Sequence, residues 1–147
     1  DKAFAILKKL AFFEGVDSKI LSKCVKNIKL KRYEKYETII EEGDIDDTIF
    51  LIVKGAVAVY KYRKYEKEKL IGVLKEGQVF GEVVYLLGVQ RSATVKVSIN
   101  DSLILSFRLN GDYLDSKEAS ASAVLIYKNI AKSLALKLDA LNNRFCI

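Results

Sequence analysis

The sequence predicts an α+β fold in which an eight-stranded β jelly-roll barrel is flanked by an N-terminal helical segment and by C-terminal helices. Two observations lead to this prediction. Hydrophobic residues repeat with helical spacing at both ends of the chain, whereas residues 28–108 contain short β-branched or aromatic runs separated by turn residues. Several short strands at this spacing are typical of a barrel or jelly roll.

The chain has 147 residues, the size of one domain, and half of them are hydrophobic. We expect a single domain over 1–147, made of N-terminal helices (1–27), a β-barrel (28–108) and C-terminal helices (110–143). No run reaches the roughly 18 apolar residues of a membrane-spanning helix, and the start does not resemble a signal peptide. We therefore expect a cytoplasmic protein that inserts none of these residues into a membrane. Because the sequence does not begin with Met, we expect a piece of a longer protein.

The N-terminal segment, residues 3–26, is predicted to be helical. Phe4, Leu7 and Leu10 have helical spacing, and Gly15 interrupts the pattern. Asp17 or Ser18 can cap a second helix, because their side chains accept hydrogen bonds from first-turn N–H groups. Its hydrophobic positions are Ile20, Leu21, Val25 and Ile28.

The middle of the chain supplies the strands. The β-branched or aromatic runs are 39–40, 49–53, 57–60, 70–74, 93–97 and 103–107. Turns are expected at 42–44, 54–55, 76–77 and 100–101, where glycine, asparagine or aspartate allows tight backbone geometry.

The net charge of +6 raises the question of a nucleic-acid partner. The dense basic run, 61–69, includes two glutamates and lies between two apolar strands, so a solvated hairpin tip explains it better than a phosphate-tracking patch. We expect no direct nucleic-acid contact. A modest positive field would still favour a small anionic ligand.

The C-terminal part, residues 111–143, is again predicted to be helical. One face carries a hydrophobic stripe of Ile126, Ile130, Leu134, Leu138 and Leu141. So long a stripe has to cover the barrel mouth, a second copy of the chain, or both. A homodimer through this helix, or an effector domain or protein, is therefore an expected partner.

Composition excludes several classes of chemistry. With Cys24 and Cys146 far apart and no histidine, we expect two free thiols and neither a zinc nor an iron–sulfur site. A Ser-His-Asp or Cys-His nucleophile would lack its base. We expect no metal, no cofactor and no enzymatic activity.

The segment 80–95 departs from the strand pattern. It begins with Gly81, which allows close backbone approach to a ligand, continues with a short apolar helix ended by Gly88, and returns to strand after Arg91. A helix N-terminus beside an arginine is suited to an anion, because unsatisfied N–H groups and a planar guanidinium both donate to phosphate oxygens. Glu82 would be repelled by a phosphate, so we expect it to accept hydrogen bonds from a sugar hydroxyl. Together these groups describe a nucleotide with one phosphate and a free ribose hydroxyl.

This segment resembles the phosphate-binding cassette of cyclic nucleotide-binding domains: Phe-Gly-Glu, a short helix, then Arg, two small residues and Thr-Val. The separation of Glu82 from Arg91 is similar to that of the family. The turn 41–44, the strand and turn 50–55 and the closing helix also look like family landmarks, so the resemblance extends over nearly the whole chain.

The resemblance implies a role for each cassette residue. Glu82 is expected to hold the ribose 2′-hydroxyl, and Arg91 the exocyclic phosphate oxygens. The predicted ligand-binding set is Phe80, Gly81, Glu82, Val83, Val84, Arg91, Ser92 and Ala93; the amides of Gly81, Val83 and Ala93 and the Ser92 hydroxyl complete the cradle. Val84 and Tyr85 depart from the family, which usually has a small residue and a leucine there, and the β-branch of Val84 would crowd the first helical turn.

The predicted function is a regulatory sensor that binds cAMP, or less readily cGMP, and converts binding into movement of the C-terminal helices. Ser92 meets the demands of either nucleotide and favours cAMP only slightly. The alternative is a degenerate domain that keeps the fold as a ligand-free interaction module. A DNA-binding regulator would need a helix-turn-helix after the long helix, so that interpretation holds only if these residues are a fragment of a longer chain.

Overall fold

The computed structural model describes residues 1–64 and 66–144, which divide into two units. The strand unit comprises Asn27–Arg108. The helical unit comprises Asp1–Lys26 together with the chain from Leu109 onward. Each unit has its own buried hydrophobic residues and its own internal contacts.

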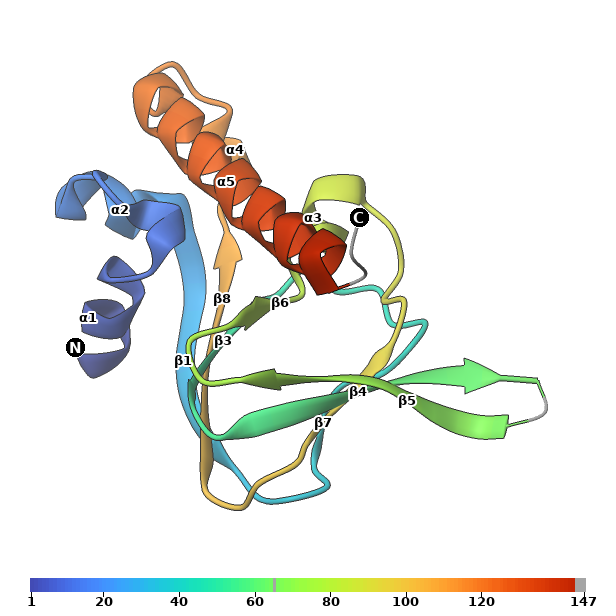
Figure 1. Ribbon diagram of the computed structural model, residues 1–147. Coiled ribbons are helices and arrows are strands. Elements are labelled where there is room, and N and C mark those ends of the chain that lie inside the picture. Colours follow the sequence, from blue (N-terminus) through green and yellow to red (C-terminus); the bar gives the residue numbers. More distant parts are fainter. Residues whose placement is uncertain (65, 145–147) are drawn as a thin grey trace. The chain divides into compact units, whose positions relative to one another are not determined.

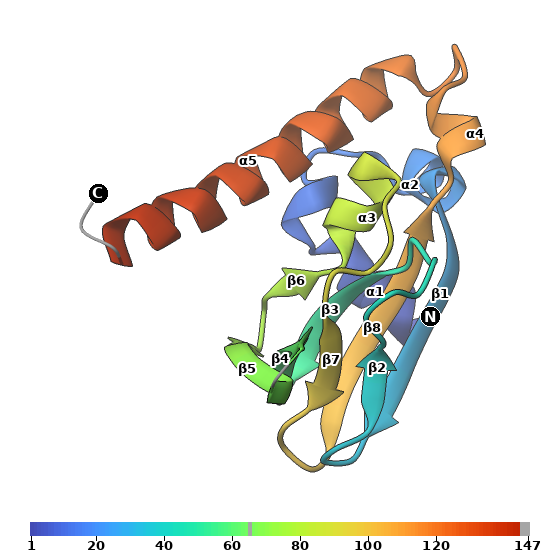
Figure 2. The ribbon, with the colours of Figure 1, turned by 90° about the vertical axis from the view of Figure 1, so that its right-hand side faces the viewer.

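The strand unit is built from two four-stranded sheets, with strand orders β1-β8-β3-β6 and β2-β7-β4-β5 (Figures 1 and 2). The pairs β2–β7, β3–β6, β3–β8, β4–β5 and β4–β7 are all antiparallel. Eight strands in two antiparallel sheets confirm the predicted jelly-roll class. Their bounds are β1 Val25–Tyr33, β2 Thr38–Ile40, β3 Ile49–Lys54, β4 Ala56–Arg63, β5 Glu66–Lys75, β6 Val79–Phe80, β7 Thr94–Val97 and β8 Ser102–Leu109.

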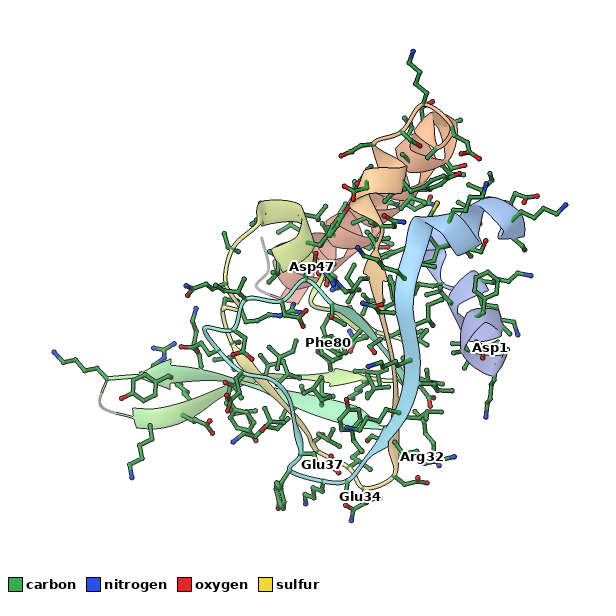
Figure 3. All side chains as sticks on the ribbon, turned by 180° about the vertical axis from the view of Figure 1, so that it is seen from behind. Asp1, Arg32, Glu34, Glu37, Asp47 and Phe80 are labelled. Atoms are coloured by element: carbon green, nitrogen blue, oxygen red, sulfur yellow. The ribbon has the colours of Figure 1, made fainter. Side chains whose placement is uncertain are left out.

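Alternation along the strands creates the core of this unit. In β8 every second side chain is buried for most of its length, because successive side chains of a strand point to opposite faces. The aromatic rings of Phe50 on β3 and Phe80 on β6 are stacked, with centroids 5.0 Å apart. Figure 3 shows Phe80 in the interior of the unit. The buried cluster consists of Ile40, Phe50, Ile52, Val57, Phe80, Val95 and Ile104.

A short helix, α3 (Glu82–Leu87), follows β6 and closes one end of the strand unit. The loop between β2 and β3 lies at the same end, where Figure 3 labels Asp47. Arg32, Glu34 and Glu37 lie at the opposite end. The cassette and this loop therefore meet at one end of the barrel.

The helical unit combines both chain termini. Its elements are α1 (Lys2–Lys8), a 3₁₀ turn η1 (Ala11–Phe13), α2 (Ser18–Cys24), α4 (Gly111–Leu114) and α5 (Ser120–Arg144). The Asp17 carboxylate accepts the N–H of Lys19 and so caps α2, as predicted. The Asn129 side-chain amide on α5 donates to the backbone oxygens of Phe12 and Glu14, each at 3.1 Å. None of the helices in the described residues is long and apolar enough to cross a membrane.

The predicted boundaries were wrong in two places, at the end of the second N-terminal helix and in the run 61–69. The second N-terminal helix was extended through Val25 and Ile28, but α2 ends at Cys24 and both residues belong to β1. Their β-branched side chains suit a strand as well as a helix face, and the place of β1 beside β8 decides between them. The C-terminal segment, predicted to be helical, contains the two helices α4 and α5. The run 61–69 is mostly strand, since β4 continues to Arg63 and β5 starts at Glu66 (Figure 1).

The hydrophobic stripe of α5 is buried only along its first part. Ile126 and Ile130 are almost completely buried, Leu134 is half-buried, and Leu138 is 59% exposed. The fifth predicted position, Leu141, has a side chain outside the described set. The C-terminal part of α5 thus exposes leucine side chains, among them Leu138, to solvent.

Candidate functional site

Gly81 begins the cassette in a conformation that other residues rarely adopt. It is the N-cap of α3 and has a φ of 90°. A Cβ at this position would lie 2.9 Å from the backbone oxygen of Thr48 and 3.0 Å from Nη1 of Arg91. Both the backbone angle and the space therefore require glycine, and this allows the arginine to pack directly against the start of α3.

The Arg91 guanidinium is buried and makes three hydrogen bonds to the protein. The residue is only 4% exposed. Nη1 donates to the Gly81 carbonyl at 3.0 Å, and Nη2 donates to the Thr48 carbonyl at 2.7 Å and to Asp46 Oδ2 at 3.4 Å. The guanidinium carbon lies 5.9 Å from the centroid of the Phe50 ring. The charge is therefore held in a fixed position between the cassette, β3 and the preceding loop.

The backbone of Arg91 is fixed as well. Its N–H donates to the carbonyl of Asp44, and its carbonyl accepts the N–H of Gly43, both at 2.8 Å. These two bonds attach the segment before β7 to the turn after β2. The turn at 41–44, which the sequence analysis identified as a turn and as a family landmark, thus positions the cassette arginine.

Asp46 is the acidic partner of Arg91. Partial burial raises the pKa of Asp46, but hydrogen bonds from the hydroxyl and N–H of Thr48 and the adjacent Arg91 charge outweigh that effect and hold the pKa below its usual value. Its Oδ1 accepts the Thr48 hydroxyl at 2.9 Å. The carboxylate is therefore ionised at neutral pH and oriented toward the guanidinium.

Glu82, in the first turn of α3, is the other buried charged residue. Among the described residues the only charged side chains classed as buried are Glu82 and Arg91, each 4% exposed. Burying a charge is costly unless specific groups receive it. Both buried charged residues belong to the predicted binding set.

The remaining predicted residues surround this pair in different ways. Phe80 is a core residue, Val84 and Ala93 are half-buried, and Val83 and Ser92 are exposed. The N–H of Gly88 donates to the carbonyl of Val84 at 2.8 Å and ends the helix. Helix α3 thus forms over Glu82–Leu87 with the β-branch of Val84 inside it.

A cavity of about 830 Å³ adjoins the cassette. Arg91 and Ser92 line it, whereas the other six predicted residues do not. Its remaining lining residues are Glu42, Gly43, Ile45, Lys61, Gly88, Val89 and Gln90. A second cavity of about 440 Å³ is lined by residues including Asp46, Val84 and Arg108, and it shares Ile45, Gly88 and Val89 with the first.

Sequence reasoning missed Asp46, Thr48 and Lys61 as parts of this site. Asp46 follows the recognised turn at 41–44, and its position next to Asp47 was the available signal. Thr48 contributes its backbone oxygen, which side-chain chemistry could not reveal. Within the described residues no group of three or more His, Cys, Asp or Glu side chains is placed to hold a metal ion.

Comparison with known proteins agrees with this geometry. Residues 30–111, more than half of the chain, match the family model of the cyclic nucleotide-binding domain. The chain is 32% identical over 89 residues to the cAMP-dependent protein kinase regulatory subunit of Mycosarcoma maydis, which covers 60% of this chain and 17% of that protein. It is 28% identical over 96 residues to human cGMP-dependent protein kinase 2, covering 65% of this chain and 13% of the kinase. The chain thus spans less than a fifth of either relative.

Solved structures agree on the fold. A cyclic nucleotide-binding domain from Methylobacillus flagellatus matches with a TM-score of 0.68 and 20% identity, over 97% of this chain and 80% of the other. The two-sheet barrel, the cassette with its buried glutamate and arginine, and the match over 30–111 lead to one conclusion. The chain belongs to the cyclic nucleotide-binding domain family.

Proposed function

We propose that this chain is a sensor domain that binds a cyclic nucleotide, cAMP in preference to cGMP, in the cassette 80–95. The observation that carries the proposal is the burial of both Glu82 and Arg91 at one end of the barrel. Relatives named as cAMP- and cGMP-dependent kinase components support the ligand class and leave the base open. We place the protein in the cytoplasm, where such a ligand is produced and read.

Arg91 is the proposed partner of the exocyclic phosphate oxygens. A cyclic phosphate carries one negative charge, which a single guanidinium matches without a metal ion. Asp46 and the two backbone carbonyls hold Arg91 in place before the ligand arrives, so little side-chain entropy is lost on binding. Asp46 is a positioning residue in this scheme.

Glu82 is the proposed partner of the ribose 2′-hydroxyl. Its position in the first turn of α3 places a carboxylate beside the segment that would receive the phosphate. The amides of Gly81, Val83 and Ala93 and the hydroxyl of Ser92 complete the proposed cradle around Phe80 and Val84. Ser92 is exposed and lines the larger cavity, so its hydroxyl is accessible to a ligand.

Binding is proposed to move the C-terminal helices. The chain divides into a strand unit that contains the whole cassette and a helical unit that contains α4 and α5. A ligand shifts such an equilibrium by the difference in its affinity for the two states. The role is one of binding and regulation, with no catalytic step. The output would be read by an effector domain or protein, or by a second copy of the chain through α5, whose Leu136 and Leu138 are more than half exposed.

One observation favours the alternative of a ligand-free interaction module. The guanidinium of Arg91 already donates to two carbonyls and faces Asp46, so a phosphate has to compete with these groups. Phosphate binding is favourable only if the phosphate is a stronger acceptor for the guanidinium than these groups, which requires a fully charged ligand. A direct titration separates the two functions.

The experiment is a calorimetric titration of the 147-residue chain with cAMP and with cGMP, for the wild type, Arg91→Ala and Arg32→Ala. Loss of the buried guanidinium should weaken binding by about 2–5 kcal/mol. Arg32 is a matched control because it also pairs with an aspartate, Asp101 at 2.7 Å, but lies exposed at the opposite end of the barrel (Figure 3). Its removal should leave affinity unchanged. Absence of saturable heat with either nucleotide, from a folded and ligand-free preparation, would reject the sensor function and favour the interaction module.

A further inference from the structure

Lys61 is an exposed residue of β4, close to the cassette. Along this strand Val57 is completely buried and Val59 packs against the core cluster. Because side chains alternate along a strand, Lys61 belongs to the same face. The other face carries Tyr60, whose ring lies 5.4 Å from the ammonium of Lys96.

Lys61 lines the same cavity of about 830 Å³ as Arg91 and Ser92. Among the side chains that the structure describes, none forms a hydrogen bond or an ion pair with the ammonium of Lys61, whereas Arg91 is paired with Asp46. Glu42 is the acidic residue on the cavity wall, and its Oε1 accepts the backbone N–H of Tyr62 at 3.1 Å. Lys61 is thus a basic residue of the cavity wall that forms no ion pair with a described carboxylate.

The register of the hairpin adds a second positive charge beside the first. Lys61 on β4 is directly opposite Lys69 on β5. Directly opposite side chains of an antiparallel pair have Cβ atoms about 5 Å apart, and like charges in this arrangement are destabilising. A bound anion would relieve this repulsion, while the protein without ligand has to tolerate it.

We propose that Lys61 is a second cationic contact for the nucleotide, donating to an acceptor atom of the ligand bound beside Arg91. The proposal rests on the proposed function and extends it to a residue outside the cassette. Composition alone assigns Lys61 to a solvated hairpin tip, whereas the strand register and the cavity place it at the binding site. An ammonium only donates, so its targets are the phosphate oxygens or the acceptor atoms N7 and O6 of a purine.

The test compares Lys61→Gln with Lys67→Gln by calorimetric titration with cAMP and with cGMP. Lys67 is a matched control because it is exposed on the same hairpin and is not among the residues that line the cavity. Both variants lose one positive charge, so a general field effect lowers affinity equally in the two. A specific contact should lower affinity about fivefold in Lys61→Gln and less than about twofold in Lys67→Gln.

Thermal unfolding without ligand supplies a second readout. Lys61→Gln removes one member of the like-charged pair, so its melting temperature should equal or exceed that of the wild type while its affinity falls. Equal losses for the two nucleotides would locate the contact at the phosphate, and a larger loss for cGMP would locate it at the base, where guanine offers N7 and O6 together.

Two outcomes overturn the role of Lys61: wild-type affinity in Lys61→Gln, or an equal loss in Lys67→Gln. Either one leaves the proposed function intact if the wild type still binds a nucleotide. A wild-type chain that binds neither nucleotide rejects the proposed function, and the role of Lys61 with it.

Discussion

Asp46 Oδ2 lies 3.4 Å from Nη2 of Arg91, and the pair joins a half-exposed carboxylate to a buried guanidinium. The two side chains differ in burial: that of Arg91 is 3% exposed, whereas that of Asp46 is 49% exposed. The arginine depends on this carboxylate and on two carbonyls for its counter-charge and its hydrogen bonds. The aspartate keeps contact with water.

This relationship predicts a pH-dependent contribution of Asp46 to stability. Since its pKa is lowered in the folded state, the contribution is fully present above the ordinary aspartate pKa of about 4. It is lost as the pH falls through the lower folded-state value. Asp46→Asn should therefore unfold more easily than the wild type at pH 7, by about 1 kcal/mol or less because solvent screens a half-exposed carboxylate. Urea unfolding at pH 7 and at pH 3 measures the difference.

The control for this prediction is the pH series itself. The stability gap between wild type and Asp46→Asn should narrow as the pH is lowered, because the wild-type carboxyl then becomes neutral as well. A gap that stays constant from pH 7 to pH 3 would show that the carboxylate charge contributes nothing.

Gly81→Ala should be more destabilising than the matched change Gly77→Ala. Both glycines have positive φ, 90° and 86°, so each substitution costs about 1–2 kcal/mol in backbone strain. At Gly77 an added Cβ meets nothing within 4 Å, whereas at Gly81 it meets the Thr48 carbonyl and Arg91. The crowding should add about 1–3 kcal/mol to the loss in unfolding free energy measured in urea. Equal losses in the two variants would mean that the cassette can relax around the methyl group.

The sequence could reveal those residues of the site that lie close together along the chain, but not those that only the fold brings together. Glu82 and Arg91 belong to one short segment, so their residue types and spacing were visible together. Asp46 is 45 residues from Arg91, and only the folded barrel brings them together. The Thr48 carbonyl could not be predicted, because every residue has a backbone carbonyl whatever its type.

The same limit explains the errors in the fold. Val25 and Ile28 fit a helical period and a strand equally well, and pairing with a distant part of the chain decides between them. Lys61 belongs to a run of charges that suggests a solvated tip until the pairing of β4 with β5 assigns its face. Local patterns thus identified most of the strands, whereas the ends of elements and the groups that hold Arg91 in place depend on tertiary contacts.

Asn129 should be important for the stability of the helical unit. Its amide donates to the carbonyls of Phe12 and Glu14, which joins α5 to η1. Asn129→Ala removes both bonds and should lower the free energy of unfolding by about 1–2 kcal/mol. Lys128→Ala is the matched control, because Lys128 is exposed on the same turn of α5. A loss in the control as large as in Asn129→Ala would attribute the effect to α5 itself.

Cys24 should react with a thiol reagent only when the helical unit opens. Its side chain is completely buried at the end of α2, and burial raises the pKa of the thiol. Both effects slow the reaction, since the reagent cannot reach the sulfur and the reactive thiolate is scarce. The experiment uses Cys146→Ser, which removes the other thiol of the sequence, and follows modification by a disulfide reagent with increasing urea.

In the absence of urea the reaction should be slower than in the unfolded chain by about a thousandfold or more, because it follows the small population of open molecules. Adding a saturating cyclic nucleotide should change this rate if binding alters the stability of the helical unit, which makes Cys24 a reporter for the proposed movement. Asn129→Ala should speed modification in proportion to its loss of stability, because it loosens the same unit. A native rate close to the unfolded rate would contradict the burial of Cys24 and show that α2 separates readily from its neighbours.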